Sequence, residues 1–327
     1  MEYWFIFFSL AGVIFFSGKN LIKYGDILSE KLNIGKTILG VVFIASITSL
    51  PELITGISAS AYVGAPDLVG GDVLGSCMAN LLILAVLDAY VKDQPLTTKV
   101  HHGFTISSAF GIILISVASS GILLKEVLPE IGWVSVVSFV IIIIYIFAVK
   151  ITASYEKRLI KEVSKEIKYR DISTKEAFFK YMFNAFIIVI AATFLPKVGH
   201  ILADMYGISE TFFGSLFIAV STSLPELAVS IAGVKLNLIQ VAVANLLGSN
   251  IFNIFILAVS DFFYTKTSIF RDMSLKNTIP AVFSVLMTSI VIIGLVYKAQ
   301  RKEFPLGIES IFLIISYLVG LYFIFIS

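Results

Sequence analysis

The stretch IASITSLPEL, residues 44–53, places a proline and a glutamate inside an apolar segment, and it recurs as IAVSTSLPEL at residues 218–227. The match extends into both flanks at a constant offset of 174 residues. The next segment repeats as well, because LGSCMANLLILAVLD at 74–88 aligns with LGSNIFNIFILAVSD at 247–261. Self-similarity of this extent indicates that the chain contains two copies of one structural unit.

Composition places these two copies in a membrane. Of the 327 residues, 58% are apolar and 14% are charged, whereas a soluble domain has about 45–50% and about 25%. An apolar excess of this size cannot be hidden in a globular core. No ten-residue alternation typical of barrel strands occurs, so the sequence predicts an all-α integral membrane protein of the cell membrane.

Several functional classes are disfavoured at once. The net charge of +2 gives no electrostatic footprint for nucleic acid. The single Cys77 allows no intramolecular disulfide and no cysteine-rich metal site, and the three histidines lack HExxH spacing. We therefore expect no enzyme, no cofactor and no nucleic-acid partner, and we expect a monomer.

A membrane-spanning helix needs about 20 mostly apolar residues, and the chain divides into ten such stretches. The first lacks a basic leader and a small-residue cleavage site, so we expect a retained span. The ten stretches lie near residues 3–24, 37–63, 68–91, 103–123, 130–152, 178–204, 208–234, 237–263, 277–297 and 305–326.

The basic residues predict the orientation. Residues 1–152 and 178–327 are each expected to form a five-helix unit, with 153–177 as a polar cytoplasmic linker. Of the 24 lysines and arginines, 19 fall on the side of the linker and five on the other side, which places both termini outside the cell. Two copies separated by five crossings run in opposite directions. The sequence thus predicts ten transmembrane helices as two inverted-topology repeats, the construction of secondary transporters.

Pro51 and Pro225 are expected to break their helices, because proline lacks an N–H and clashes with the carbonyl four residues before it. Each break frees backbone carbonyl oxygens in a region without water. The oxygens of residues 45–48 and 219–222 are therefore candidate ion ligands.

Glu52 and Glu226 carry the sharper functional signal. An ionisable group at the centre of a bilayer costs at least about 2.5–3.5 kcal/mol, and no lysine or arginine is expected at matching depth. A bound cation or protons are the remaining ways to hold these carboxylates.

Further oxygen-bearing residues repeat around the two glutamates. Ser76 and Asn80 are one helical turn apart, as are Ser249 and Asn253, so each pair shares a helix face. Oxygen donors without thiolate or imidazole select hard cations, and Ca²⁺, with six to eight oxygen ligands, fits better than octahedral Mg²⁺. The hydroxyl-bearing residues before the Pro-Glu pairs are Thr48, Ser49, Thr222 and Ser223.

Other acidic residues receive a structural interpretation. Asp88 and Asp261 each fall eight residues after an asparagine, near opposite membrane faces, and we expect solvated carboxylates at helix ends, with ion funnelling as the alternative. Asp72 aligns with Asn245 and is expected to be interfacial. Cys77 is expected to be a small packing residue.

The segments SITSLPELITGISAS with GGDVLGSCMANLL, and VSTSLPELAVSIAG with VANLLGSNIFNIF, resemble the two repeats of the sodium/calcium exchanger family of the Ca²⁺/cation antiporter superfamily. The resemblance implies central sites at which Ca²⁺ and Na⁺ compete for overlapping ligands, with inorganic cations and the lipid bilayer as the partners. At the matching positions, the resemblance implies that Glu52 and Glu226 bridge Ca²⁺ and that Thr48 and Thr222 provide backbone carbonyl ligands to it. It implies that Asn80 and Asn253 lie in the middle of the cluster of sites. The residues that it implies for the Na⁺ sites are Ala45, Ser49, Ser76, Ala219, Ser223 and Ser249.

The sequence departs from the family at several positions. Many microbial members carry Asp where this chain has Asn253, and most carry Gly where it has Ile47 and Ser221. Proton-coupled relatives in the superfamily also use two glutamates, so Ca²⁺/H⁺ exchange is the alternative to Ca²⁺/Na⁺ exchange. A cation channel is a further alternative, although two facing carboxylates favour a site that is emptied by competition over weak multi-site binding.

Overall fold

The computed structural model describes residues 2–32, 34–162, 171–205, 222–302 and 304–327, and they are helical apart from connections and one short hairpin. Among the described residues, eight helices are long and apolar enough to cross a membrane, and the number of spans is nine if one bent pair of helices is counted as a span. The predicted span 208–234, the seventh along the chain, lies largely outside the described residues, and its described end forms α10 (Leu224–Lys235). The eight are α1 (Glu2–Lys31), α5 (Pro66–Ala89), α6 (Gly103–Leu123), α7 (Val136–Glu162), α8 (Thr174–Met205), α11 (Ile239–Phe263), α13 (Thr278–Tyr297) and α14 (Ile308–Ile326).

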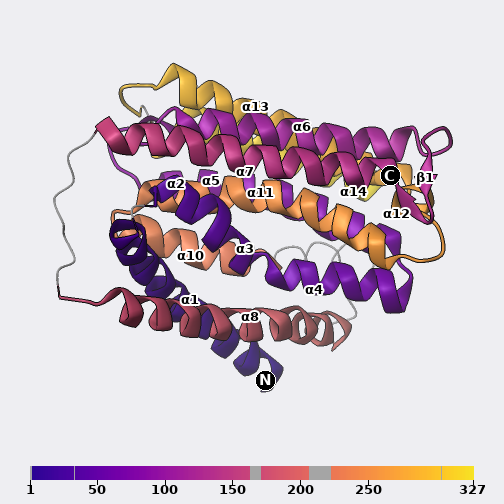
Figure 1. The fold of residues 1–327 in the computed structure, drawn as a ribbon, viewed down its shortest axis with the longest axis horizontal. Coiled ribbons are helices and arrows are strands. Elements are labelled where there is room, and N and C mark those ends of the chain that lie inside the picture. The colour runs from indigo at the N-terminus through magenta and orange to yellow at the C-terminus, as the bar shows by residue number, and fades with distance from the viewer. Residues whose placement is uncertain (1, 33, 163–170, 206–221, 303) are drawn as a thin grey trace.

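Helices α5 and α11 form the centre of the molecule. In their most apolar windows, 78% and 94% of the residues are buried, against 22–44% in the other long spans. Both helices are therefore enclosed by other parts of the protein along most of their surface. Helices α6, α7 and α13 lie on one side of this pair, and α1 crosses α8 on the other side (Figure 1). The two copies of the segment that follows TSLPEL are therefore packed against each other at the core.

The segment that precedes TSLPEL packs directly on α11 through glycines. It runs through α2 (Lys36–Ile38), the π-helical η1 (Leu39–Ile44) and α3 (Ala45–Thr48). A Cβ atom on Gly40 would collide with Ala244, and one on Gly248 would collide with the backbone of Val41. Small residues of this kind let two membrane helices approach backbone to backbone.

The predicted helix break at Pro51 is confirmed. Helix α3 ends at Thr48, and α4 (Leu50–Ser58), continued by η2 (Ala59–Val63), leaves at an angle of 43°. The hinge residue Ser49 has φ −92° and ψ 9°. In the second copy, Ser223 adopts φ −84° and ψ 1° directly before α10. The backbone at Ser49 and at its counterpart Ser223 therefore has nearly the same conformation, and the residues before Thr222 lie outside the described part of the chain.

The connections are more ordered than predicted. Residues 130–135, assigned to a span, instead form a hairpin in which β1 (Glu130–Ile131) pairs antiparallel with β2 (Val134–Ser135). The predicted polar linker, 153–177, is helical at both of its ends, because α7 continues to Glu162 and α8 begins at Thr174. The remaining short elements are η3 (Leu96–Lys99), α12 (Ile269–Asp272) and η5 (Leu275–Asn277).

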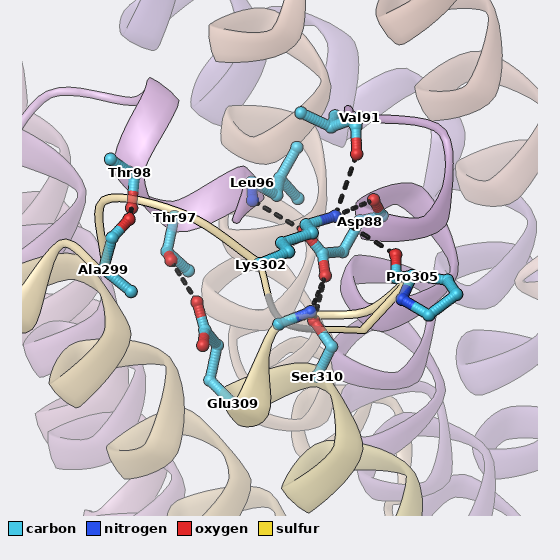
Figure 2. A network of polar contacts seen from close by, with 11 residues as sticks. Asp88, Val91, Leu96, Thr97, Thr98, Ala299, Lys302, Pro305, Glu309 and Ser310 are labelled. Carbon is cyan, nitrogen blue, oxygen red and sulfur yellow. Dashed lines mark hydrogen bonds and ion pairs between the residues drawn. The ribbon is translucent and has the colours of Figure 1, made fainter. Parts of the chain in front are cut away.

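The expectation that Asp88 and Asp261 are solvated is wrong, because their exposed fractions are 1% and 0%. Asp88 accepts hydrogen bonds from Leu96 N at 2.7 Å, Gly307 N at 2.6 Å and Ser310 Oγ at 2.9 Å (Figure 2). The carboxylate thereby ties the end of α5 to the start of α14.

Asp261 does the same at the end of α11. It accepts from Ile269 N at 2.7 Å, Ser135 N at 2.8 Å and Ser138 Oγ at 2.6 Å. In both cases one donor is the backbone N–H eight residues downstream, and the others are an N–H and a serine hydroxyl three residues apart at a helix start. At both carboxylates, N–H and hydroxyl groups of the protein take the place of water as hydrogen-bond donors. Such hydrogen bonds are what allows a polar group to be buried.

Lys302 distinguishes the two helix-end clusters. Its Nζ lies 2.8 Å from Asp88 Oδ1, and the two side chains are only 5% and 1% exposed. The same ammonium group donates to the Val91 carbonyl at 2.9 Å (Figure 2). Asp261 has no corresponding ion pair within the described ranges.

The Lys302→Met variant tests whether the Asp88 cluster stabilises the fold. It leaves a buried carboxylate without its cation, a change that typically costs about 3–5 kcal/mol. We expect a clearly lower unfolding temperature for the purified protein in detergent. Arg271→Met is the matched control, because the Arg271 side chain is 48% exposed and its 3.4 Å pair with Glu130 should contribute at most about 1 kcal/mol. Equal unfolding temperatures for the two variants would contradict this assignment.

Candidate cation-binding site

Glu52 and Glu226 occupy equivalent places at the centre of the molecule. Each is the third residue of its helix, α4 or α10, directly after a broken segment. Both are 1% exposed. The first turn of a helix carries partial positive charge and unsatisfied N–H groups, which favour a carboxylate there. The Pro-Glu sequence thus creates a helix start inside an apolar region and places an acid on it.

The hydrogen bonds around the two glutamates differ. Glu226 Oε1 accepts from Ser49 Oγ at 3.0 Å and from Ser249 Oγ at 3.3 Å. Ser49 belongs to the first broken helix, so this bond links the two copies of TSLPEL. Ser223 Oγ and Ser76 Oγ, the equivalent hydroxyls on the other side, are buried without a hydrogen-bond partner.

Two threonines connect the broken helices to the central helices. Thr48 Oγ1 donates to Asn245 Oδ1 on α11 at 3.2 Å. Thr222 Oγ1 donates to Asp72 Oδ1 on α5, also at 3.2 Å. Each threonine crosses from one copy to the other. The interfacial placement expected for Asp72 is therefore wrong: it is 5% exposed and lies beside the second TSLPEL segment.

The central helices present polar residues in parallel stripes. Asp72, Ser76 and Asn80 recur every four residues along α5, and Asn245, Ser249 and Asn253 do so along α11. Such spacing places each set on one helix face. We refer to these six residues, together with Thr48, Ser49, Glu52, Thr222, Ser223 and Glu226, as the central polar cluster.

Asn250 and Cys77 join the two central helices next to this cluster. Asn80 Nδ2 donates to Asn250 Oδ1 at 3.0 Å, and Asn250 Nδ2 donates to the Cys77 carbonyl at 3.2 Å. Cys77 is buried and its thiol is free. Sequence reasoning did not single out Asn250 or Asn245, although both lie in the repeated α11 segment.

Within the cluster, many buried oxygen atoms have no partner in the protein. Nine-tenths or more of buried polar groups normally have a hydrogen-bond partner. This concentration of unpartnered oxygen atoms therefore indicates a site for a ligand other than protein atoms. Asn253 Nδ2 is also unpartnered. The oxygens are Glu52 Oε2, Asp72 Oδ2, Ser76 Oγ, Asn80 Oδ1, Ser223 Oγ, Glu226 Oε2 and Asn253 Oδ1.

No basic side chain balances the acids. In the part of the chain that the structure describes, no ion pair involves Glu52, Asp72 or Glu226. The same residues contain no group of three His, Cys, Asp or Glu side chains close enough to enclose one metal ion. A cation here would therefore draw on at most two carboxylates together with neutral hydroxyl, amide or carbonyl oxygens.

The predicted ligands are mostly brought together. Eleven of the twelve lie in the described ranges, and all eleven are buried. The Ala45 carbonyl, expected to be free, accepts from Ser49 N at 2.9 Å and Thr48 Oγ1 at 3.2 Å. Ala219 lies outside the described residues. Asp72 is a further buried acid that lies beside these residues and outside the predicted set.

Comparison with known proteins agrees with this geometry. The family model described as sodium/calcium exchanger protein matches residues 2–152 and 177–326. Inner membrane protein YrbG of Escherichia coli is 30% identical over 283 residues, covering 84% of this chain and 85% of that protein. Sodium/calcium exchanger MaX1 of Methanosarcina acetivorans is 25% identical over 374 residues, covering 96% and 97%.

Solved structures of the sodium-calcium exchanger NCX_Mj share the fold. One superimposes with a TM-score of 0.76 at 20% sequence identity and covers 98% of each chain. The residues matched by the family model include both TSLPEL segments and both stripes of the polar cluster. The chain therefore belongs to the sodium/calcium exchanger protein family and is a multi-pass membrane cation antiporter.

Proposed function

We propose that the protein exchanges Ca²⁺ for Na⁺ across the cell membrane by alternating access at the central polar cluster. The observation that carries this proposal is the pair Glu52 and Glu226, both buried and, within the described residues, both without a basic partner. Ionised carboxylates in such surroundings cost several kcal/mol each unless a counter-charge accompanies them. A transported cation supplies that counter-charge and must be replaced by another before the cluster is stable again.

Ca²⁺ suits the two glutamates by charge and ligand chemistry. Their two negative charges match one divalent ion, and amide, hydroxyl and backbone oxygens complete a shell of six to eight. The unpartnered Asn80 and Asn253 oxygens are available for this purpose. The proposed ligand set is Glu52, Glu226, Asn80, Asn253, Thr48, Thr222, Ser49, Ser223, Ser76, Ser249, Ala45 and Ala219.

Na⁺ is the counter-ion that we favour over H⁺. It is a hard cation that accepts the same hydroxyl and carbonyl oxygens as Ca²⁺. The relative MaX1 and the structural neighbour NCX_Mj are both named as sodium/calcium exchangers. Proton exchange is the alternative, because the same carboxylates can also bind protons.

We further propose that the chain is built as two inverted five-helix repeats, 1–152 and 178–327, joined by a cytoplasmic linker at 153–177. The support is that contacts in one copy recur in the other at nearly constant sequence offset. Thr48 contacts Asn245 as Thr222 contacts Asp72. The hydrogen-bond cluster of Asp88 likewise corresponds to that of Asp261. Ten spans follow if the second TSLPEL segment crosses the membrane as the first does. The hinges at Ser49 and Ser223 would then face opposite sides.

Neutralising either glutamate should stop exchange without unfolding the protein. We expect Glu52→Gln and Glu226→Gln each to abolish Ca²⁺ transport, since each removes a ligand and a charge but also relieves the cost of a buried acid. The measurements are ⁴⁵Ca²⁺ flux in proteoliposomes and the unfolding temperature in detergent. Glu126→Gln, in an exposed loop, is the control and should transport normally. Persistent Ca²⁺ transport by either glutamate variant would refute the site.

The counter-ion is tested by the internal solution of the proteoliposomes. We expect saturable ⁴⁵Ca²⁺ uptake when the vesicles contain Na⁺, and little uptake when they contain K⁺ or are acidic inside. Uptake driven by the acidic interior alone would establish H⁺ exchange instead. Flux that needs no ion on the opposite side would indicate a channel.

The topology is tested by single-cysteine labelling in a Cys77→Ser background. An impermeant thiol reagent applied to intact cells should modify Glu2→Cys and Ser327→Cys and spare Asp171→Cys. All three positions are exposed, so labelling depends on sidedness and not on burial. Labelling of position 171 alone would reverse the proposed orientation, and a split between the two termini would exclude ten spans.

A further inference from the structure

We propose that Asp72 is a third anionic ligand of the central polar cluster and determines how strongly monovalent cations compete with Ca²⁺ there. The inference rests on the proposed function of the cluster but concerns a residue outside the proposed ligand set. Asp72 is 5% exposed, its Oδ1 accepts from Thr222 at 3.2 Å, and its Oδ2 has no partner.

The position of Asp72 on α5 places it among other unpartnered oxygens. Asp72, Ser76 and Asn80 follow one another at intervals of four residues, and each has a buried oxygen without a hydrogen bond. The carboxylate also interacts electrostatically with Glu52. Asp72 thus extends the ligand stripe by one turn beyond Ser76.

Asp72 differs from Asn245, its counterpart on α11, in how fully its polar atoms are hydrogen-bonded. Asn245 uses both ends of its amide, because Oδ1 accepts from Thr48 and Nδ2 donates to Ser230 Oγ at 3.1 Å. The residue equivalent to Ser230 in the first copy is Gly56, where a Cβ atom would lie 2.7 Å from Ser260 Oγ. Position 56 therefore cannot supply a hydroxyl to Asp72 as Ser230 does to Asn245, and Asp72 Oδ2 has no hydrogen-bond partner.

The charge of Asp72 affects the two kinds of cation differently. With three ionised acids, one Ca²⁺ leaves a negative charge uncompensated, whereas a load of several monovalent cations can neutralise the cluster. The three acids do not converge on one metal position in the described residues. Asp72 accordingly serves a cation position next to the one shared by the glutamates, and loss of its charge weakens a multi-ion load more than a single Ca²⁺.

Asp72→Asn tests this role, since it keeps the shape and an acceptor for Thr222, as Asn245 does for Thr48. The measurement is ⁴⁵Ca²⁺ binding to detergent-purified full-length protein, with displacement by Na⁺. We expect the Na⁺ concentration for half-displacement to rise by about tenfold or more, with a smaller loss of Ca²⁺ affinity. Asp67→Asn, an exposed acid on the same helix, is the matched control and should behave as wild type.

A rescue variant separates a role in charge from a role in packing. Asp72→Asn combined with Asn253→Asp returns one carboxylate to the cluster at a different place. Displacement by Na⁺ should shift back toward the wild-type concentration. A structural role of Asp72 would leave the double variant as impaired as the single one.

The outcomes are distinguishable from failure of the proposed function. If Na⁺ does not displace Ca²⁺ even from wild type, the Na⁺ counter-ion is wrong, and the Ca²⁺ affinity of Asp72→Asn alone decides the role of Asp72. Unchanged Ca²⁺ affinity and unchanged displacement in that variant would overturn the inference. If Asp72→Asn does not give monodisperse protein, Asp72→Ser removes the same charge and keeps a hydroxyl for Thr222.

Discussion

The structure depends on one constraint, which is that acidic side chains are buried at its centre with no basic side chain paired to them in the described residues. Glu52, Glu226 and Asp72 are each at most 5% exposed, and in the described part of the chain none of them pairs with a lysine or arginine. Charge in a low-dielectric interior is tolerated only where dipoles, hydrogen bonds or counter-ions compensate it. The broken helices supply the dipoles, since each glutamate stands in the first turn of a helix that begins inside the protein. The compensation remains incomplete, and this is the physical reason for the proposal that cations bind at the cluster.

At the ends of the two central helices, in contrast to their midpoints, the buried carboxylates have a full set of hydrogen-bond donors. Asp88 and Asp261 each accept three hydrogen bonds from ordered donors and fasten the ends of α5 and α11 to their neighbours. The midpoints of the same two helices carry unpartnered oxygens instead. Movement that exchanges ions is therefore expected to occur in the broken helices, around Ser49 and Ser223, while α5 and α11 stay in place.

The sequence predicted the features that are local and repeated. TSLPEL revealed the breaks at Ser49 and Ser223 because proline acts on its own helix, and the depth of both glutamates followed from their apolar surroundings. Contacts between distant segments could not be read in the same way. Asp88 looked like a solvated helix end because its donors Gly307 and Ser310 lie more than 200 residues away. Residues 130–135 looked like part of a span because Ile131, Trp133 and Val134 are apolar in a hairpin.

The incorrect expectation for Asp72 shows that a position at which the two repeats differ can be more informative than a position at which they match. Repeats at nearly constant offset drew attention to matching residues, so an acid whose counterpart is an asparagine was set aside. Yet Asp72 and Asn245 have the same threonine contact and differ only in charge and in their second partner. The differences between Asp72 and Asn245 and between Gly56 and Ser230 are among those that make the two sides of the cluster chemically distinct. Selectivity among cations is therefore expected to reside in the positions at which the two copies have diverged.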